Sequence, residues 1–479
     1  MSRISIASDH DSSDALPVSQ GRIADFADDP VVCMRRLWAR HGEVAALEEG
    51  TQRIHFVFGP HYTKQVLSDA TTFHSRFFAL RGPRRSSHRR VTSGLLSMNG
   101  DEHRRHRRMV MQPFQKSAIG AYHETVCEVA DELVSGWQPG QLVDINAEMT
   151  RYMLRLTSRI LFGLDNAELA EHVGELTERW VALNHALGPA AFSADDASTD
   201  LYEELLAAAG ELEVAAKEMI RSRRDGKPGS DVLSLLLRAH DEQGGITDEQ
   251  LMGHIVLLFG AAHLTSAHTL TWTLLLLAQH PDVMRQLHEE LTTVVGDREP
   301  RQEDLDALPY LDRVLKESMR VLPASSYSQR VAAEPTQLGP FSLAPGAVVI
   351  FSQFITHHLP ELYAEPERFL PDRWLDLRPS PYAYLPFGAG PRMCIGAALG
   401  MMQLKISLPS LLRRFKFSLV PGATVNARVM STMLFPTTSV PMRIESQDGQ
   451  FTSQPIGGNI HTLVDFPSVS GASPIRKAA

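Results

Sequence analysis

Hydrophobic and polar positions follow a helical period over most of the middle of this 479-residue chain. Apolar residues recur there every three to four positions, which is the spacing of amphipathic helices. Pro281, directly after His280, is typical of the first turn of a new helix. The helices predicted from this period cover residues 102–115, 117–136, 146–163, 167–187, 197–224, 230–240, 247–278, 281–295 and 310–321.

Shorter patterns lie on both sides of this helical region. A short helix is predicted at 60–69 and a longer one at 395–413, directly after Cys394. Runs with strand character bounded by turn signals, such as Pro345–Gly346, predict strands at 53–59, 327–332, 337–343 and 347–352. The fold class expected from these elements is mainly α with a minor β part.

The chain is expected to form one domain over residues 21–445, because no linker or charge block divides it there. The polar residues 1–20 are expected to be disordered, and 446–479, rich in Ser, Gly and Pro, to form a flexible C-terminal tail. Residues 74–97 lack a clear period and predict a long basic loop. The apolar stretch 251–278 contains three histidines and predicts a buried helix, so no membrane anchor is expected.

Charge and cysteine content narrow the function classes. The formal net charge of −9 and the pI near 6.1 argue against a general nucleic-acid binder. Three cysteines (Cys33, Cys127 and Cys394) are too few for a disulfide framework and fit a reducing cytoplasm. One stretch is nevertheless basic, and it fits a solvated face, an anionic cofactor, an acidic partner or a charged substrate. Its arginines are Arg76, Arg81, Arg84, Arg85, Arg89, Arg90, Arg104, Arg105, Arg107 and Arg108.

The segment Phe387–Gly396, Phe-Gly-Ala-Gly-Pro-Arg-Met-Cys-Ile-Gly, carries the strongest chemical signal. Its glycines allow the backbone to turn tightly and to approach a flat ligand. Cys394 precedes a predicted helix, where the dipole and free N–H groups favour the thiolate and tune its bonding to a metal. The alternative is a free cysteine buried after a loop.

Five residues of this segment match the haem-binding signature of the cytochrome P450 family: Phe387, Gly390, Arg392, Cys394 and Gly396. Such a match arises by chance about once in three million windows at even residue usage. The resemblance covers roughly residues 20–445 and implies a cytochrome P450 fold. In that fold the haem is buried between a long distal helix and the cysteine loop with its proximal helix, and Cys394 ligates the iron. The resemblance also implies a buried structural triad of Glu317, Arg320 and Arg373.

The resemblance implies haem b (iron protoporphyrin IX) as the cofactor. Its propionates need cationic or hydrogen-bonding partners. His103 and Arg107 lie four residues apart on one predicted helix face, and the family places such a pair at a propionate. Arg330 and Arg392 match the other propionate partners. The remaining expected cofactor contacts are Phe387, Gly388, Gly396 and Ala261.

Thr265 aligns with the alcohol that the family places on the oxygen side of the haem, and Ser266 follows it as a second candidate catalytic residue. Two positions depart from the family pattern, because Ala262 replaces a glycine and Leu264 replaces an acid. A leucine cannot relay protons. Protons are therefore expected to pass through Thr265, Ser266 and water or through substrate groups, unless the enzyme performs a different reaction. His263 replaces the acid only if its ring turns inward.

The expected substrate-contacting residues are apolar with a few hydroxyl groups, which suits a hydrophobic small molecule. They are Phe77, Leu95, Trp180, Leu187, Leu264, Ala324, Ser325 and Met433.

The resulting hypothesis is a cytoplasmic, monomeric haem-thiolate monooxygenase that uses dioxygen to hydroxylate a hydrophobic small molecule, in secondary metabolism. The chain contains no flavin or ferredoxin domain, so a separate ferredoxin/reductase-type electron donor is expected, and no nucleic-acid partner. Two alternatives stay open. Leu264 motivates a haem-thiolate enzyme that performs cyclisation, coupling or desaturation, and a non-catalytic haem-binding sensor is the alternative of another class.

Overall fold

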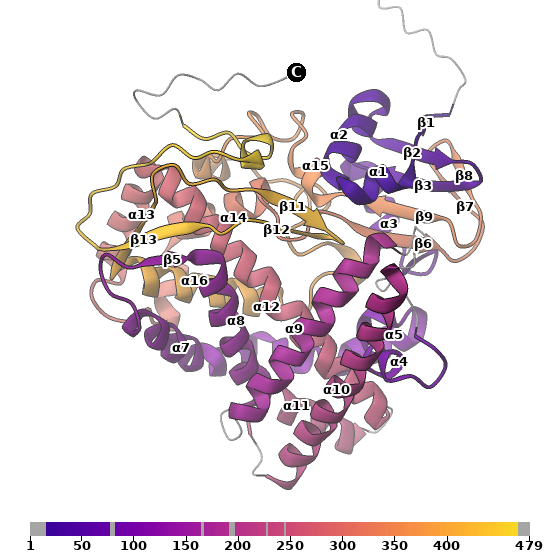
Figure 1. Ribbon diagram of the computed structural model, residues 1–479, viewed down its shortest axis with the longest axis horizontal. Helices are drawn as coiled ribbons and strands as arrows, with labels where there is room; N and C mark the ends of the chain where they lie inside the picture. The colour runs from indigo at the N-terminus through magenta and orange to yellow at the C-terminus, as the bar shows by residue number, and fades with distance from the viewer. Residues whose placement is uncertain are drawn as a thin grey trace, which may run out of the picture.

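The long helix α12 (Asp248–Gln279) runs through the centre of the molecule (Figure 1). The computed structural model describes residues 16–76, 82–163, 167–190, 197–226, 229–243 and 246–467. The Thr247 side chain accepts a hydrogen bond from Gln250 N, and the Gln250 side chain accepts one from Thr247 N, so a capping box starts the helix. By length and composition α12 alone among the described helices could cross a membrane, but it is largely buried inside the protein, as predicted for 251–278.

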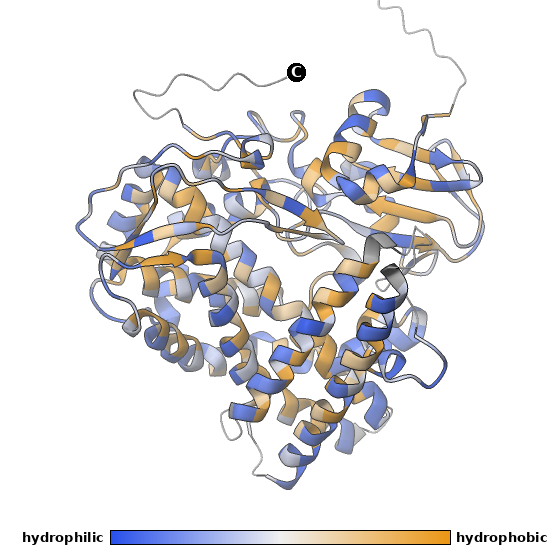
Figure 2. Ribbon diagram, in the orientation of Figure 1, coloured by the Kyte–Doolittle hydropathy of each residue, from blue (hydrophilic) through white to orange (hydrophobic). Residues whose placement is uncertain are grey.

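Helices pack around α12 on several sides, and α8, α9, α14 and α16 all contact it. Figure 2 shows hydrophilic residues alternating with hydrophobic ones along α9 and α10, as expected for helices with one buried face. The other main helices are α7 (His123–Ser135), α8 (Ile145–Phe162), α9 (Ala167–Ala190), α10 (Ala197–Asp225), α11 (Val232–Gln243), α13 (Pro281–Val294), α14 (Pro309–Val321) and α16 (Ala397–Leu412).

One predicted helix, 102–115, is shorter in the structure. Helix α5 (Gly100–Val110) ends before Pro113, which has no backbone N–H to donate and therefore stops the helical ladder. The predicted helix 117–136 is divided into α6 (Lys116–Ile119), a 3-10 turn at Gly120–Tyr122, and α7. Within the expected loop 74–97 the chain forms two short pieces, α4 (Ser87–Val91) and a 3-10 helix at Leu95–Ser97.

A six-stranded sheet forms the minor β part, in the order β1-β2-β3-β9-β6-β4. Its strands are β1 (Val18–Gln20), β2 (Val44–Glu49), β3 (Gln52–Val57), β4 (Phe73–Ser75), β6 (Ser328–Ala332) and β9 (Val348–Phe351). β3 and β9 pair in parallel with Ile54 opposite Val348, whereas β6 runs antiparallel to β9. Helices α1 (Ile23–Asp28) and α2 (Pro30–His41) contact β2, and α3 (Pro60–Ser68) follows β3 along the chain.

Two further differences from the expected strands concern hairpins and the N-terminus. The segment 337–343 is not one strand but a hairpin of β7 (Thr336–Leu338) and β8 (Phe341–Leu343), because the chain reverses at Gly339, whose φ is 54°. Residues 18–20, expected to be disordered, pair with β2 as strand β1, while residues 1–15 lie outside the described residues. The small sheets contain β5 (Leu142–Asp144), β10 (Phe415–Leu419), β11 (Ala427–Met430), β12 (Met433–Pro436) and β13 (Pro441–Ser446).

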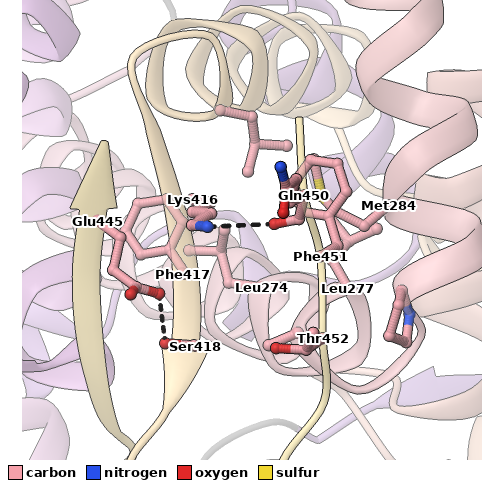
Figure 3. A pocket seen from close by; sticks show the side chains of 13 residues that line it. Leu274, Leu277, Met284, Lys416, Phe417, Ser418, Glu445, Gln450, Phe451 and Thr452 are labelled. Carbon is pink, nitrogen blue, oxygen red and sulfur yellow. Dashed lines mark hydrogen bonds between the residues drawn. The ribbon is translucent and has the colours of Figure 1, made fainter. Parts of the chain in front are cut away.

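The described part of the expected flexible tail, up to residue 467, packs against the core. Ile456, Ile460 and Val464 are buried, and Asp465 N donates to Glu367 O at 2.9 Å. These scattered apolar residues bury surface although Ser and Gly dominate the composition around them. Figure 3 shows Phe451 of this segment beside Leu277 and Met284 in a pocket at the C-terminal end of α12.

Candidate functional site

The loop before Cys394 is folded tightly against α3. Gly388 and Gly390 have φ values of 67° and 72°, which side chains rarely adopt. A Cβ atom on Gly390 would lie 2.3 Å from the carbonyl oxygen of Leu67, so only glycine fits there. Cys394 N donates to Phe387 O at 2.8 Å and closes the loop. The sequence at these positions therefore fixes where the thiol is presented.

Cys394 is an exposed residue two positions before Gly396, the N-cap of α16. Surrounding protein atoms raise the pKa of this thiol, while the backbone N–H of Gly396, which donates to it, and the guanidinium of Arg107 lower it. Arg107 Nη2 also donates to Met393 O at 2.6 Å, which ties α5 to the loop. By contrast, burial raises the pKa of Cys33 and of Cys127 to about 11, which fits inert thiols.

Four donor groups from three elements meet beside this loop: His103 and Arg107 of α5, Arg330 of β6, and Arg392. Arg392 Nη2 donates to Asn99 Oδ1 at 2.6 Å and to Met98 O, so its position is fixed by the segment before α5. The Arg330 guanidinium lies over the Phe351 ring, 5.1 Å from its centroid, and Nη1 donates to Gln329 O. All four residues are ones predicted from the sequence, and the structure brings them together.

The charge of this cluster has no counterpart in the described part of the chain. None of Arg107, Arg330 and Arg392 forms an ion pair with a described carboxylate. Burial lowers the pKa of Arg330 to about 10, and burial together with Arg330 and Arg107 does the same for Arg392. Burial, then Arg392, Arg107 and Arg330, lower the pKa of His103 to about 4. The buried Arg330 and the partly buried Arg107 and Arg392 are stabilised by a ligand with two negative charges, and the neutral His103 adds a hydrogen-bond donor, so the residues present fit a haem with two propionates.

The middle of helix α12 is partly exposed to solvent. Residues on both sides of the stretch 260–266 are buried, but Ala261 is exposed and Leu264, Thr265 and Ser266 are partly exposed. Ala261 and Thr265 lie one helical turn apart and so share a face. This uncovered, mostly apolar face is the one expected to lie on the oxygen side of the haem.

The hydroxyl groups of this stretch differ in their bonding. Thr265 Oγ1 donates to Ala261 O at 2.9 Å, which leaves its oxygen lone pairs open to a donor. Ser266 is partly exposed and makes no hydrogen bond to the described residues. His263 is fully buried, its Nδ1 donates to Phe259 O at 3.2 Å, and its ring lies 5.3 Å from the Phe259 ring. Burial lowers the pKa of His263 to about 4, so this residue is a neutral core histidine and not a substitute for the missing acid.

The predicted substrate-contacting residues come from elements that adjoin α12. Trp180 and Leu187 are buried on α9, and Leu95 is buried in the 3-10 helix before α5. Ser325 forms an isolated β-bridge with Met433 of β12, and Leu434 N donates to Ala324 O at 3.0 Å. Both α9 and β12 contact α12. Phe77 lies outside the described residues.

Glu317 and Arg320 are fully buried, and Arg373, which is partly exposed, joins them in one network. Arg320 Nε and Nη2 each donate to Glu317 at 2.9 Å, and Arg373 Nε donates to the same carboxylate at 2.8 Å. Arg320 also donates to the carbonyl oxygens of His357, Pro366 and Arg368. The network therefore ties α14 to the segment that leads into the cysteine loop.

Two residues of the site were not predicted. Trp374 Nε1 donates to Glu317 Oε2 at 2.9 Å, and its place directly after Arg373 was the available signal. Asn99 Oδ1 accepts hydrogen bonds from both Arg392 and Ser75 N while Asn99 precedes the first residue of α5. An asparagine before a helix reads as an ordinary cap, so the sequence gives no sign of this second role.

Comparisons with known proteins agree with this geometry. The family model described as cytochrome P450 matches residues 20–444. Cyclooctat-9-en-7-ol 5-monooxygenase from Streptomyces melanosporofaciens is 32% identical over 395 residues, 80% of this chain and 84% of that protein. Pentalenene oxygenase from Streptomyces avermitilis is 27% identical over 409 residues, 83% and 89% of the two chains. The solved heme domain of cytochrome P450DA has a TM-score of 0.76 at 23% identity and covers 88% of this chain and 94% of that chain, which shows a shared fold.

Proposed function

The chain belongs to the cytochrome P450 family of haem-dependent oxidoreductases, and from this premise we propose that it is a monooxygenase that hydroxylates a terpene or a similarly hydrophobic small molecule. The observation that carries the proposal is Cys394 beside three arginines, the buried Arg330 and the partly buried Arg107 and Arg392, that pair with no acidic side chain among the described residues. Two relatives support the substrate class, because their names describe oxygenation of cyclooctat-9-en-7-ol and of pentalenene.

Residues of this chain would hold haem b through its iron and through its propionates. Cys394 would ligate the iron, and His103, Arg107, Arg330 and Arg392 would bind the propionates. When bound, the haem supplies the reductive activation of dioxygen and the transfer of one oxygen atom to the substrate. The Gly396 N–H stabilises negative charge on Cys394 Sγ and so tunes its donation to the metal.

Proton delivery falls to the hydroxyl groups of α12. Thr265 Oγ1 keeps its own proton on Ala261 O and can accept a second hydrogen bond from water on the uncovered face. Ser266 supplies a further hydroxyl group, whereas Leu264 has no proton to give and contributes an apolar wall. The proton path therefore runs through Thr265, Ser266 and water.

A separate electron donor is expected to dock on α5. Arg105 and Arg108 are exposed on this helix, whose other face carries His103 and Arg107 toward the haem site. Exposed charges of this kind steer the encounter with an acidic ferredoxin-type protein more than they set its affinity. We place the enzyme in the cytoplasm and treat it as a monomer.

Turnover under labelled dioxygen tests the proposal. The enzyme is supplied with a ferredoxin and its reductase, NAD(P)H, and pentalenene or cyclooctat-9-en-7-ol, with Cys394→Ala as the inactive control. One labelled oxygen atom in the product, absent from the control reaction, is the expected result. A product without labelled oxygen would show that the enzyme performs cyclisation, coupling or desaturation instead of hydroxylation. Leu264, which cannot relay protons, motivates this alternative. If no substrate stimulates NAD(P)H consumption, the protein is better explained as a non-catalytic haem-binding sensor.

A further inference from the structure

His268 lies on the same face of α12 as Ala261 and Thr265. Residues at i, i+4 and i+7 align along a helix, so His268 follows Thr265 by one turn, about 4.5 Å along the axis. Leu264, four residues before His268, also belongs to the uncovered stretch of the helix. The His268 ring therefore borders the end of the face assigned to the substrate pocket.

The imidazole of His268 is buried without a hydrogen-bond partner. Its exposed fraction is 6%, Nδ1 is sealed from solvent, and neither ring nitrogen bonds to a described residue. Three other buried histidines, His263, His280 and His358, each place Nδ1 on the carbonyl oxygen four residues earlier, at 2.7–3.2 Å. His268 does not take the corresponding carbonyl of Leu264. Nε2 of His263 and of His358 is also unpaired, but each of these rings keeps one hydrogen bond, whereas His268 has none to the described residues. A buried polar group left unpaired costs stability, and a bound molecule that supplies a partner would recover that cost.

The ring is also held in place. It stacks on Phe435 of β12 with centroids 6.0 Å apart and an interplanar angle of 23°. One turn further along α12, Trp272 Nε1 donates to Leu434 O at 3.2 Å, which fixes β12 against the helix. A polar group on two rigid elements is oriented before a ligand arrives, and this reduces the entropy lost on binding.

The charge state of the ring defines what it recognises. Burial, with smaller contributions from His263 and His185 of α9, lowers the pKa of His268 to about 3, so the ring is neutral near pH 7. A neutral imidazole presents one N–H donor and one nitrogen acceptor. A hydroxyl group both donates and accepts, so it pairs with this ring in either tautomer. A carboxylate would only accept, and an ammonium group would only donate.

We propose that His268 is the polar anchor of the substrate pocket and that it hydrogen-bonds the hydroxyl group of an otherwise hydrocarbon substrate. The proposal rests on the proposed function and narrows its substrate class to a hydrophobic alcohol. Because His268 is one turn from Thr265, the anchored hydroxyl fixes which carbon atom lies beside the catalytic threonine. His268 is thus a positioning residue, and a reaction that installs the first hydroxyl group precedes this enzyme.

Paired ligands that differ only in a hydroxyl group test the proposal on the haem-loaded protein. The dissociation constants of cedrol and its parent hydrocarbon cedrane, and of 1-adamantanol and adamantane, are measured by the spin-state change of the haem absorption. Four proteins are compared: wild type, His268→Phe, His268→Gln and His263→Phe. Phenylalanine keeps the stacking on Phe435 but lacks both nitrogens, glutamine restores a donor and an acceptor, and His263 is a matched histidine packed away from the uncovered face.

The wild type is expected to prefer the alcohol of each pair. His268→Phe should reduce that preference about fivefold to tenfold, the value of one neutral hydrogen bond. His268→Gln should retain part of the preference, and His263→Phe should keep the wild-type ratio. A wild type without preference for the alcohols, or a His268→Phe variant that keeps it, overturns the proposal. These outcomes leave the thiolate spectrum and oxygen transfer intact, whereas failure of the proposed function abolishes one of the two.

Discussion

Arg320 donates hydrogen bonds to both carboxylate oxygens of Glu317 at 2.9 Å, and neither side chain has any exposed surface. A buried pair of charges is tolerated only when each is satisfied, and here every further donor of Arg320 reaches a main-chain carbonyl. The pair therefore acts as a fixed junction between α14 and the segment 357–374.

Arg320→Leu should lower the free energy of unfolding by about 3–5 kcal/mol, because it leaves the Glu317 carboxylate buried with fewer partners. Urea unfolding measures this change. Arg285→Leu is the matched control, since Arg285 pairs with Asp282 at the surface and its loss should cost less than about 1 kcal/mol. Equal losses in the two variants would show that the buried pair is not a junction.

Arg330→Leu should have opposite effects on the apoprotein and the haem complex. Removal of a buried cation whose pKa is depressed to about 10 should stabilise the apoprotein by about 1–3 kcal/mol. Loss of a charged hydrogen bond to a propionate should speed haem transfer to an acceptor protein about tenfold to a hundredfold. Arg89→Leu, at an exposed arginine, should change neither quantity. Unaltered haem transfer in Arg330→Leu would remove this residue from the cofactor site.

Thr265→Ala should uncouple electron use from product formation. The variant loses the hydroxyl group that holds a proton at Oγ1, and neither Leu264 nor the buried His263 replaces it. Product formed per NAD(P)H consumed should fall about tenfold, with more hydrogen peroxide released, while Thr265→Ser should stay near the wild type. A normal product yield from the alanine variant would show that protons arrive by another route.

Acid should destabilise this protein steeply, because burial makes several histidines harder to protonate in the folded state than in the unfolded chain. Burial lowers the pKa of His254, His268 and His357 to about 3, and of His263 and His280 to about 4. The unfolded chain binds protons below about pH 6.5 and the folded protein does not. The stabilisation is therefore complete above pH 6.5 and is lost as the pH falls toward 4.

Each such histidine should cost about 1 kcal/mol between pH 6.5 and 5.5. Urea unfolding at several pH values measures the slope. His280→Phe should reduce the slope of unfolding free energy against pH by the contribution of one proton. The variant should still fold, because Phe369 can pack against the new ring. The surface variant His61→Phe should leave the slope unchanged. Parallel pH profiles for the wild type and His280→Phe would refute this origin of acid sensitivity.

The sequence predicted the long helices and the chemistry of the cysteine loop because both depend on local patterns. Glycines occupy positions 388 and 390, where the turn requires them, and an almost continuous apolar stretch fills 251–278, so both features can be read from adjacent residues. The described tail was missed, since its few apolar residues bury surface only against distant elements. The unpaired nitrogens of His268 were also invisible, because the sequence shows a histidine in an apolar helix but not whether a partner reaches it.

The cluster of His103, Arg107, Arg330 and Arg392 could be predicted only in part from local sequence. Spacing places His103 and Arg107 on one helix face, but nothing local joins them to Arg330, more than two hundred residues away. The resemblance to a known family supplied that connection. The structure added the physical reason, which is that the three arginines pair with no carboxylate in the described ranges.

The assignment of Cys394 as the thiolate ligand of a haem iron is tested most directly by the absorption spectrum of the reduced, carbon-monoxide-bound protein. We expect the red-shifted band of a haem thiolate in the wild type and its absence in Cys394→Ala, with Cys127→Ala unchanged as the control. A wild-type protein that binds haem but lacks this band, or a Cys394→Ala variant that keeps it, would show that Cys394 is not the ligand.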